Sequence, residues 1–143
     1  MKRVLVDTSA WVEKASPDNF DRATGSSADA RLTALIASDL VAVTEPVIME
    51  VLAGARNDQR ERDLRRLLLR FERIPFDATT DFDGAVRIYR TCRAQGITPR
   101  GLVDCMIASV VIRAEATLLA FDRDLAAIAA VMHLHLDEAS LSA

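Results

Sequence analysis

Residues 101–112 read GLVDCMIASVVI, and Asp104 is the only charged residue among them. Its neighbours are apolar or small, so the stretch predicts a largely buried helix. An ionised carboxylate in an apolar interior is costly in free energy, and it normally pairs with a cation, takes up a proton or binds a metal. The nearest cation in the sequence is Arg100. Asp104 is therefore expected to belong to a buried polar site.

Three more acids stand within or directly after apolar runs. Asp7 follows VLV, Asp122 follows LLAF, and Glu50 lies inside VIMEVLAG. Asp7 and Asp122 each also fit a cap of the next helix, with Asp124 competing for the second cap. Glu50 has no Lys or Arg three or four residues away to pair with. Together these acids indicate a carboxylate cluster that holds a hard cation, and oxygen ligands favour Mg²⁺ or Mn²⁺ over Zn²⁺.

The composition is typical of a globular protein with one domain over residues 1–143. Half of the residues are hydrophobic and 27% are charged. No apolar run is long enough to cross a bilayer, and no secretory signal is seen, so a cytoplasmic location without membrane contact is expected. Cys92 and Cys105 fit no metal or redox spacing and are expected to be reduced and structural. His133 and His135 lie far from the acids in sequence and are interpreted in the same way.

The arginines are concentrated in two segments, although the formal net charge is −3. Residues 56–73 hold seven arginines against four acids, and residues 87–100 hold four arginines and no acid. The second set, Arg87, Arg90, Arg93 and Arg100, lies next to the Asp104 segment and is predicted to contact the phosphates of a polyanionic substrate. An acidic centre with basic flanks suits an enzyme that acts on a polyanion. The alternative is a solvated helix surface with many ion pairs.

Alternating strand and helix patterns predict an α/β domain. Strands are expected at 4–6, 41–45, 73–76, 117–121 and 134–136, and helices at 10–15, 28–40, 46–56, 58–72, 80–95, 101–113 and 125–132. Strands joined by helical crossovers predict a central, mainly parallel twisted sheet in a three-layer α/β/α arrangement. Ligands of such sheets collect beyond the carboxyl ends of the strands. The acids at those ends are therefore expected to share one crevice.

At this point the sequence resembles a known family, the PIN-domain ribonucleases of the VapC toxin type. The matching segments are VLVDTSAW, PVIMEVLAG, LVDCMIAS and AFDRDL, in that order along nearly the whole chain. One departure is the loop at 16–27, whose first half is an insertion relative to the family pattern. The resemblance implies a PIN-like fold with catalytic metal ligands at Asp7, Glu50, Asp104 and Asp122. It also implies Asp124 as an additional ligand, and either Thr8 or Ser9 as the residue that orients Asp7.

The resemblance also implies an activity and partners. The expected activity is that of a Mg²⁺-dependent endoribonuclease toxin that hydrolyses RNA phosphodiester bonds, with tRNA or other structured RNA as substrate. The expected partners are a second copy of the chain and a cognate VapB-like antitoxin. We expect the antitoxin to insert an Arg or Lys among the acids and to cover apolar surface around Trp11 and residues 32–36.

Two other functions compete with this interpretation. A phosphoaspartyl protein also places an Asp after the first strand, but it uses a nearby Lys, and Lys2 and Lys14 are the only lysines here. The phosphatase version also needs an Asp at position 9, which is Ser. A catalytically silent PIN-like scaffold that binds RNA or protein predicts a damaged acidic set. The set is intact, which favours the enzyme.

Overall fold

The computed structural model describes residues 2–14 and 27–140, so residues 16–26 of the expected insertion loop lie outside the described part. The described elements, in chain order, are β1 (Val4–Val6), α1 (Thr8–Lys14), α2 (Ser27–Ala37), β2 (Val41–Val43), α3 (Glu45–Ala53), α4 (Asp58–Leu68), β3 (Glu72–Arg73), α5 (Ala78–Ala94), α6 (Leu102–Arg113), β4 (Thr117–Leu119) and α7 (Arg123–Val131). All the predicted helices and four of the five predicted strands are therefore present, with shifted ends.

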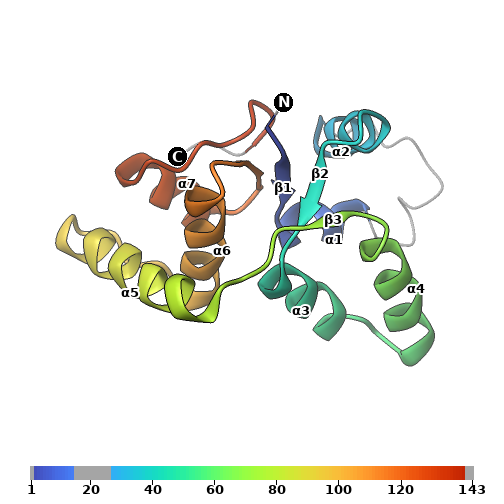
Figure 1. Cartoon of the computed structure of the whole chain (residues 1–143), viewed down its shortest axis with the longest axis horizontal. Coiled ribbons are helices and arrows are strands. Elements are labelled where there is room, and N and C mark those ends of the chain that lie inside the picture. The colour runs from blue at the N-terminus through green and yellow to red at the C-terminus, as the bar shows by residue number, and fades with distance from the viewer. Residues whose placement is uncertain (1, 15–26, 141–143) are drawn as a thin grey trace.

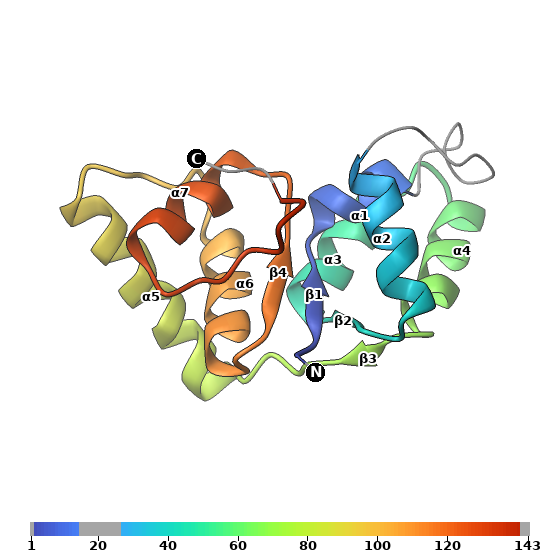
Figure 2. The same ribbon diagram turned by 90° about the horizontal axis from the view of Figure 1, so that it is seen from above.

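The four strands form one parallel sheet in the order β3-β2-β1-β4. The first strand lies in the middle because β2 and β4 pair with its two edges. Helices α5, α6 and α7 lie on one side of β1 and β4, and α1, α2 and α4 lie on the other, as Figures 1 and 2 show. The predicted three-layer α/β/α fold with a parallel sheet is confirmed.

The predicted strand at 134–136 is wrong. Within this segment Leu136 forms only a single bridge with Leu118 of β4. The Asp137 amide still donates to the Leu118 carbonyl at 2.7 Å, while the Asp137 carboxylate accepts hydrogen bonds from Arg31 and from the backbone amide of Ala139. The chain then turns at residues 138–139, so the alternating pattern LHL forms a contact of one residue with the sheet and not a strand.

Helix α6 supplies much of the core, as its apolar sequence predicted. Its residues Cys105, Ile107, Ala108, Val110 and Val111 are buried against the sheet and the neighbouring helices. Both cysteines are free thiols and buried, in line with a structural role. None of the helices in the described part of the chain combines the length and apolar character needed to span a bilayer.

The early helices correct one expectation about the surface. Trp11, Leu32 and Leu35 are almost fully buried in the core, and the Trp11 indole donates a hydrogen bond to the Val6 carbonyl. These side chains therefore offer no apolar surface to a partner, contrary to the expectation of an antitoxin contact there. A helix that covers a sheet buries its apolar face against that sheet, so helical periodicity alone marked core and not interface.

A buried ion pair joins α5 to the far end of α6. Asp81 is 0% exposed and accepts hydrogen bonds from the Arg113 guanidinium at 2.8 Å and the Ser109 hydroxyl at 2.8 Å. Burial alone would raise the pKa of Asp81, but the bonds from Arg113, the Asp77 amide and Ser109 lower it below its ordinary value. The two helices approach closely at Gly84, where a Cβ would lie 2.2 Å from the Ser109 oxygen.

Candidate metal centre

The predicted acids converge at the carboxyl edge of the sheet. Asp7 directly follows β1 and Asp122 follows β4, and these two strands are parallel neighbours. Helix α6 brings Asp104 in its first turn, and α3 brings Glu50. The topology therefore carries acids that lie far apart in the sequence to one place, because parallel strands end at the same edge.

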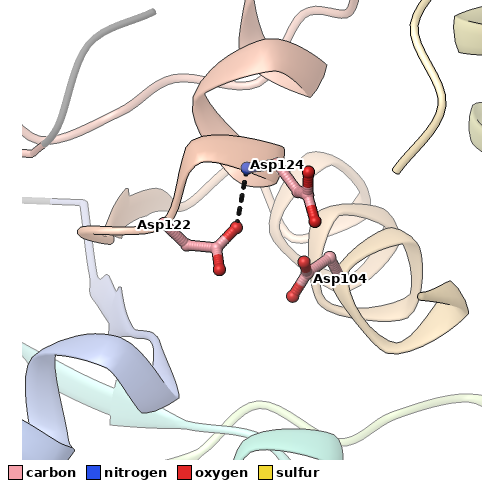
Figure 3. A group of neighbouring side chains, drawn as sticks. All are labelled: Asp104, Asp122 and Asp124. Carbon is pink, nitrogen blue, oxygen red and sulfur yellow. Dashed lines mark hydrogen bonds between the residues drawn. The ribbon is translucent and has the colours of Figure 1, made fainter. Parts of the chain in front are cut away.

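Three of the carboxylates form a tight group. Asp104, Asp122 and Asp124 each offer one oxygen, and these oxygens all lie within 4.8 Å of one another. Figure 3 shows Asp104 on one helix facing the two aspartates at the start of another. Asp122 also caps α7, since its Oδ1 accepts from the amides of Asp124 at 2.8 Å and Leu125 at 3.1 Å. Both bonds use the same oxygen, so the cap leaves Oδ2 for a ligand.

Asp104 experiences the charge of the whole cluster. Its pKa is raised to about 7, first by burial and then by the negative charges of Asp122, Asp7, Glu50 and Asp124, in that order. Asp7 and Glu50 are outside the tight group of three, but they are near enough to act on Asp104. All five predicted acids thus share one electrostatic site, and a cation bound there would relieve their mutual repulsion.

Asp7 is held on one side and left without a partner on the other. Its side chain is buried, and Oδ2 accepts hydrogen bonds from the Ser9 hydroxyl at 2.6 Å and the Ser9 amide at 3.1 Å. Oδ1 is buried and has no hydrogen-bond partner within the described residues. Burial raises the pKa of Asp7 despite the opposing bonds from Ser9. A buried carboxylate oxygen without a hydrogen-bond donor is available to bind a metal ion.

The two hydroxyl residues after Asp7 orient different acids. Ser9 serves Asp7, and its oxygen also accepts a hydrogen bond from the Phe121 amide at 2.9 Å, which ties the end of β1 to the segment after β4. Thr8 donates instead to Glu50 Oε1 at 2.8 Å. The sequence left either residue as the support for Asp7, and the structure distinguishes them.

Thr44 is a residue that the sequence did not bring to attention. It follows β2, and the register that pairs Leu5 with Ala42 brings it level with Asp7 on the neighbouring strand. Its hydroxyl is buried without a hydrogen-bond partner in the described structure, and it makes no side-chain cap to α3. In the sequence, Thr44 is a polar residue directly before the Glu-Pro pair that begins α3. That position is equally typical of an ordinary helix cap, so it did not indicate a site residue.

The four predicted RNA-contacting arginines are separated by the structure. Arg87 pairs with Asp83 on the same helix at 2.9 Å. Arg90 and Arg93 line the surface between α5 and the start of α6. Arg100 reaches the acid cluster, where its Nε and its backbone amide both donate to Asp124 Oδ2, at 3.0 and 3.2 Å. The nearest cation to Asp104 in sequence is therefore bound to another acid.

The donor set fits a hard divalent cation. The five acids offer only oxygen, one oxygen of Asp7 is buried without a partner, and Asp104 carries a strongly raised pKa in the metal-free protein. Mg²⁺ and Mn²⁺ prefer such carboxylate ligands, together with water. The Arg100 guanidinium neutralises part of the negative charge of Asp124. Among the described residues, Asp7, Asp104 and Asp122 form no ion pair.

The fold and the site together define a class of α/β protein in which a parallel sheet holds a cluster of acids beyond the carboxyl ends of its strands. The sequence profile of the PIN domain matches residues 4–131. This chain belongs to the PIN-domain family, and the resemblance noted in the sequence is confirmed.

Relatives and solved structures agree with this assignment. A VapC ribonuclease of Mycobacterium bovis and ribonuclease VapC11 of Mycobacterium tuberculosis are each 38% identical to this chain over 133 residues, which are 92% of this chain and 95% of the relative. The crystal structure of VapBC2 from Rickettsia felis bound to a DNA fragment from their promoter contains a similar chain. It has a TM-score of 0.73 and 20% identity, and the match covers 97% of this chain and 98% of that one. At 20% identity, the likeness to this solved structure concerns the fold alone.

Proposed function

We propose that this protein is a metal-dependent endoribonuclease toxin that hydrolyses phosphodiester bonds in RNA. The observation that carries the proposal is the convergence of four other acids around Asp104, whose pKa they raise together with burial. A cluster of five acids with one arginine costs stability, so a bound cation is the expected compensation. The relatives at 38% identity are VapC ribonucleases, which supports RNA as the substrate.

Each residue in and around the acid cluster has a role in this mechanism. Asp7, Glu50, Asp104 and Asp122 are the catalytic ligands of Mg²⁺ or Mn²⁺, and Asp124 is an additional ligand that Arg100 also holds. When bound, the cation supplies Lewis acidity, which lowers the pKa of an attacking water and stabilises the leaving oxygen. Ser9 keeps Asp7 in one orientation, and Thr8 does the same for Glu50. The positively charged guanidinium of Arg100, at the edge of the cluster, contacts an RNA phosphate. The expected products carry a 5′-phosphate and a free 3′-hydroxyl.

Structured RNA such as tRNA is the proposed substrate class, and the cytoplasm is the proposed location. The partners are a second copy of the chain and a VapB-like antitoxin. The solved structure from Rickettsia felis is a complex of a VapB and a VapC protein, which supports the antitoxin. An acidic crevice is best blocked by a cation, and the bond from Arg100 to Asp124 illustrates how a guanidinium fits there. We therefore expect the antitoxin to insert an Arg or Lys among the acids.

The proposal is tested by cleavage of a purified RNA mixture with and without divalent metal. We expect cleavage in Mg²⁺ or Mn²⁺ and none in EDTA, with activity restored when Mg²⁺ is added back. Full activity in EDTA would contradict the mechanism. The toxin assignment is tested separately, by expressing the chain alone and together with the neighbouring gene. A chain that is harmless alone and copurifies with no small protein is not a toxin, even if it cleaves RNA.

A further inference from the structure

A groove runs between the outer face of α5 and the start of α6, beside the acid cluster. Its volume is about 400 Å³, and its lining consists of Val86, Tyr89, Arg90, Arg93, Arg100, Gly101 and Leu102. A second hollow of about 270 Å³ shares Arg90 and Arg93 with it and extends along α5. In Figure 1 these two helices lie side by side at one end of the molecule. Among the lining residues, Arg100 alone forms a hydrogen bond or ion pair with an acid of the proposed metal centre in the described structure.

Apolar surface is unusually open in this groove. Val86 is 49% exposed and Leu102 is 54% exposed, and Tyr89 of α5 lines the groove with them. The Arg93 guanidinium lies 5.8 Å from the centre of the Tyr89 ring. At Gly101 a Cβ would meet nothing within 4 Å, so the groove is open at that point. Such a surface suits a flat, weakly polar group that can lie against aliphatic and aromatic side chains.

The rim of the groove is positive, although the chain as a whole carries a net charge of −3. Its three charged lining residues are Arg90, Arg93 and Arg100, and no acid lines it. Arg100 faces both the groove and the acid cluster, because its Nε donates to Asp124 at 3.0 Å. A ligand in the groove would therefore extend directly toward the proposed metal centre. The combination of flat apolar surface and arginines fits a nucleotide, which has a base and a phosphate.

We propose that this groove binds one unpaired nucleotide of the RNA substrate, next to the phosphate that is cut. The base lies against Val86, Tyr89 and Leu102, and its phosphate contacts Arg90 and Arg93. The nucleotide must be unpaired, because a base within a duplex hides its faces by stacking and cannot enter such a groove. Within the proposed structured substrates, the cut would then fall in a loop, a bulge or an end. The inference rests on the proposed ribonuclease function.

The structure also divides the arginines into those inside and those outside the groove. Arg93 lines it, whereas Arg87 lies on the same helix, is also exposed and pairs with Asp83. Arg87 is therefore a matched control for Arg93. Leu69, which is 64% exposed at the end of α4, is a matched control for Leu102. Each control removes the same chemical group from a surface that the groove does not include.

The test measures the affinity of the full-length protein for three RNA probes in EDTA, where the proposed mechanism gives no cleavage. The probes are a short unstructured RNA, an abasic strand of the same length and charge, and a perfect duplex. We expect the unstructured RNA to bind about ten times more tightly than the abasic strand, from stacking of one base. Leu102→Ala should abolish most of that preference, and Leu69→Ala should retain it.

Arg93→Gln should weaken binding of the unstructured and abasic strands equally and reduce the salt dependence of binding by about 0.7 in slope, while Arg87→Gln changes neither. If Leu102→Ala keeps the full preference, or changes the oligomeric state without changing RNA affinity, the groove binds something else and the inference is wrong. A wild type that cleaves RNA in Mg²⁺ but does not prefer the unstructured strand contradicts the groove alone. A wild type that neither binds nor cleaves RNA contradicts the proposed function as well.

Discussion

Helix α6 has an acid site at each end, and the two sites treat buried negative charge in opposite ways. At the far end, Asp81 is paired with Arg113 and Ser109, and its pKa is lowered. At the near end, Asp104 faces four other acids, and its pKa is raised to about 7. Burial raises the pKa at both sites, so the partners make the difference. Asp81 is paired with a cation, whereas no ion pair is formed by Asp104 within the described residues.

A third acid follows the first pattern. Asp137 is buried and is held by a bidentate pair with Arg31, at 2.8 and 3.0 Å. Burial is again opposed by these bonds, and the pKa of Asp137 is lowered below its ordinary value. This pair anchors the end of the described chain to α2. The unpaired acids at the carboxyl edge of the sheet are therefore not a general feature of this protein.

The largest difference between the two ends of α6 should be in catalysis. Asp104→Asn should lower the rate of RNA cleavage by at least about two orders of magnitude, because it removes a charged group from a preorganised site. Asp7→Asn should have a similar effect. Asp81→Asn should stay within about threefold of the wild type at a temperature where it is folded, since most surrounding contacts are kept. Initial cleavage rates of the three variants decide this, and equal losses at both ends would remove the distinction.

Stability should respond in the reverse order. Asp81→Ala should lower the free energy of unfolding by about 2 kcal/mol, somewhat less than for a fully buried pair because the Arg113 side chain is 34% exposed and can reach water. Asp104→Asn should leave the metal-free free energy of unfolding unchanged or raise it, since it removes repulsion. Denaturant unfolding in EDTA measures both values. A strongly destabilised Asp104→Asn would mean that Asp104 has a structural role.

The two sites should also differ, by a smaller amount, in how much added Mg²⁺ stabilises their variants. At about ten times its dissociation constant, Mg²⁺ should stabilise the wild type by about 1.4 kcal/mol, seen as a higher Tm. Asp81→Asn should show the same rise, because its site binds no metal. Asp104→Asn and Asp122→Asn should show a smaller rise. Thermal unfolding with and without Mg²⁺ tests this, and an equal rise in every variant would place the metal elsewhere.

The last expected effect is on the pH dependence of stability without metal. Because the pKa of Asp104 is raised from 3.8 to about 7, the folded state keeps a proton that the unfolded chain has lost in this range. The contribution of this proton to stability is fully present below pH 3.8 and is lost as the pH rises to about 7. The Tm of Asp104→Asn minus that of the wild type should therefore increase across this window. A constant difference in EDTA would show that the pKa of Asp104 is not raised.

Much of the fold could be predicted because it depends on short-range patterns. The apolar run in α6, the strand of Val4–Val6 and the Pro at the start of α3 each indicate their element without knowledge of the rest. The segment 134–136 failed because alternation does not distinguish a strand from an edge contact, and the chain turns after Asp137, which pairs with Arg31. A pairing partner 106 residues away leaves no mark on local sequence.

The sequence by itself determined which acids have no local partner, and the parallel order of strands and helices then brings them to one edge. Only the tertiary structure decided how charges pair. The Arg100 guanidinium donates to Asp124 and not to Asp104, and the Thr8 hydroxyl donates to Glu50 and not to Asp7, across 24 and 42 residues of sequence. The groove beside α6 also exists only through the packing of two helices. Periodicity and capping act within a few residues, whereas ion pairs and cavities depend on how whole elements pack.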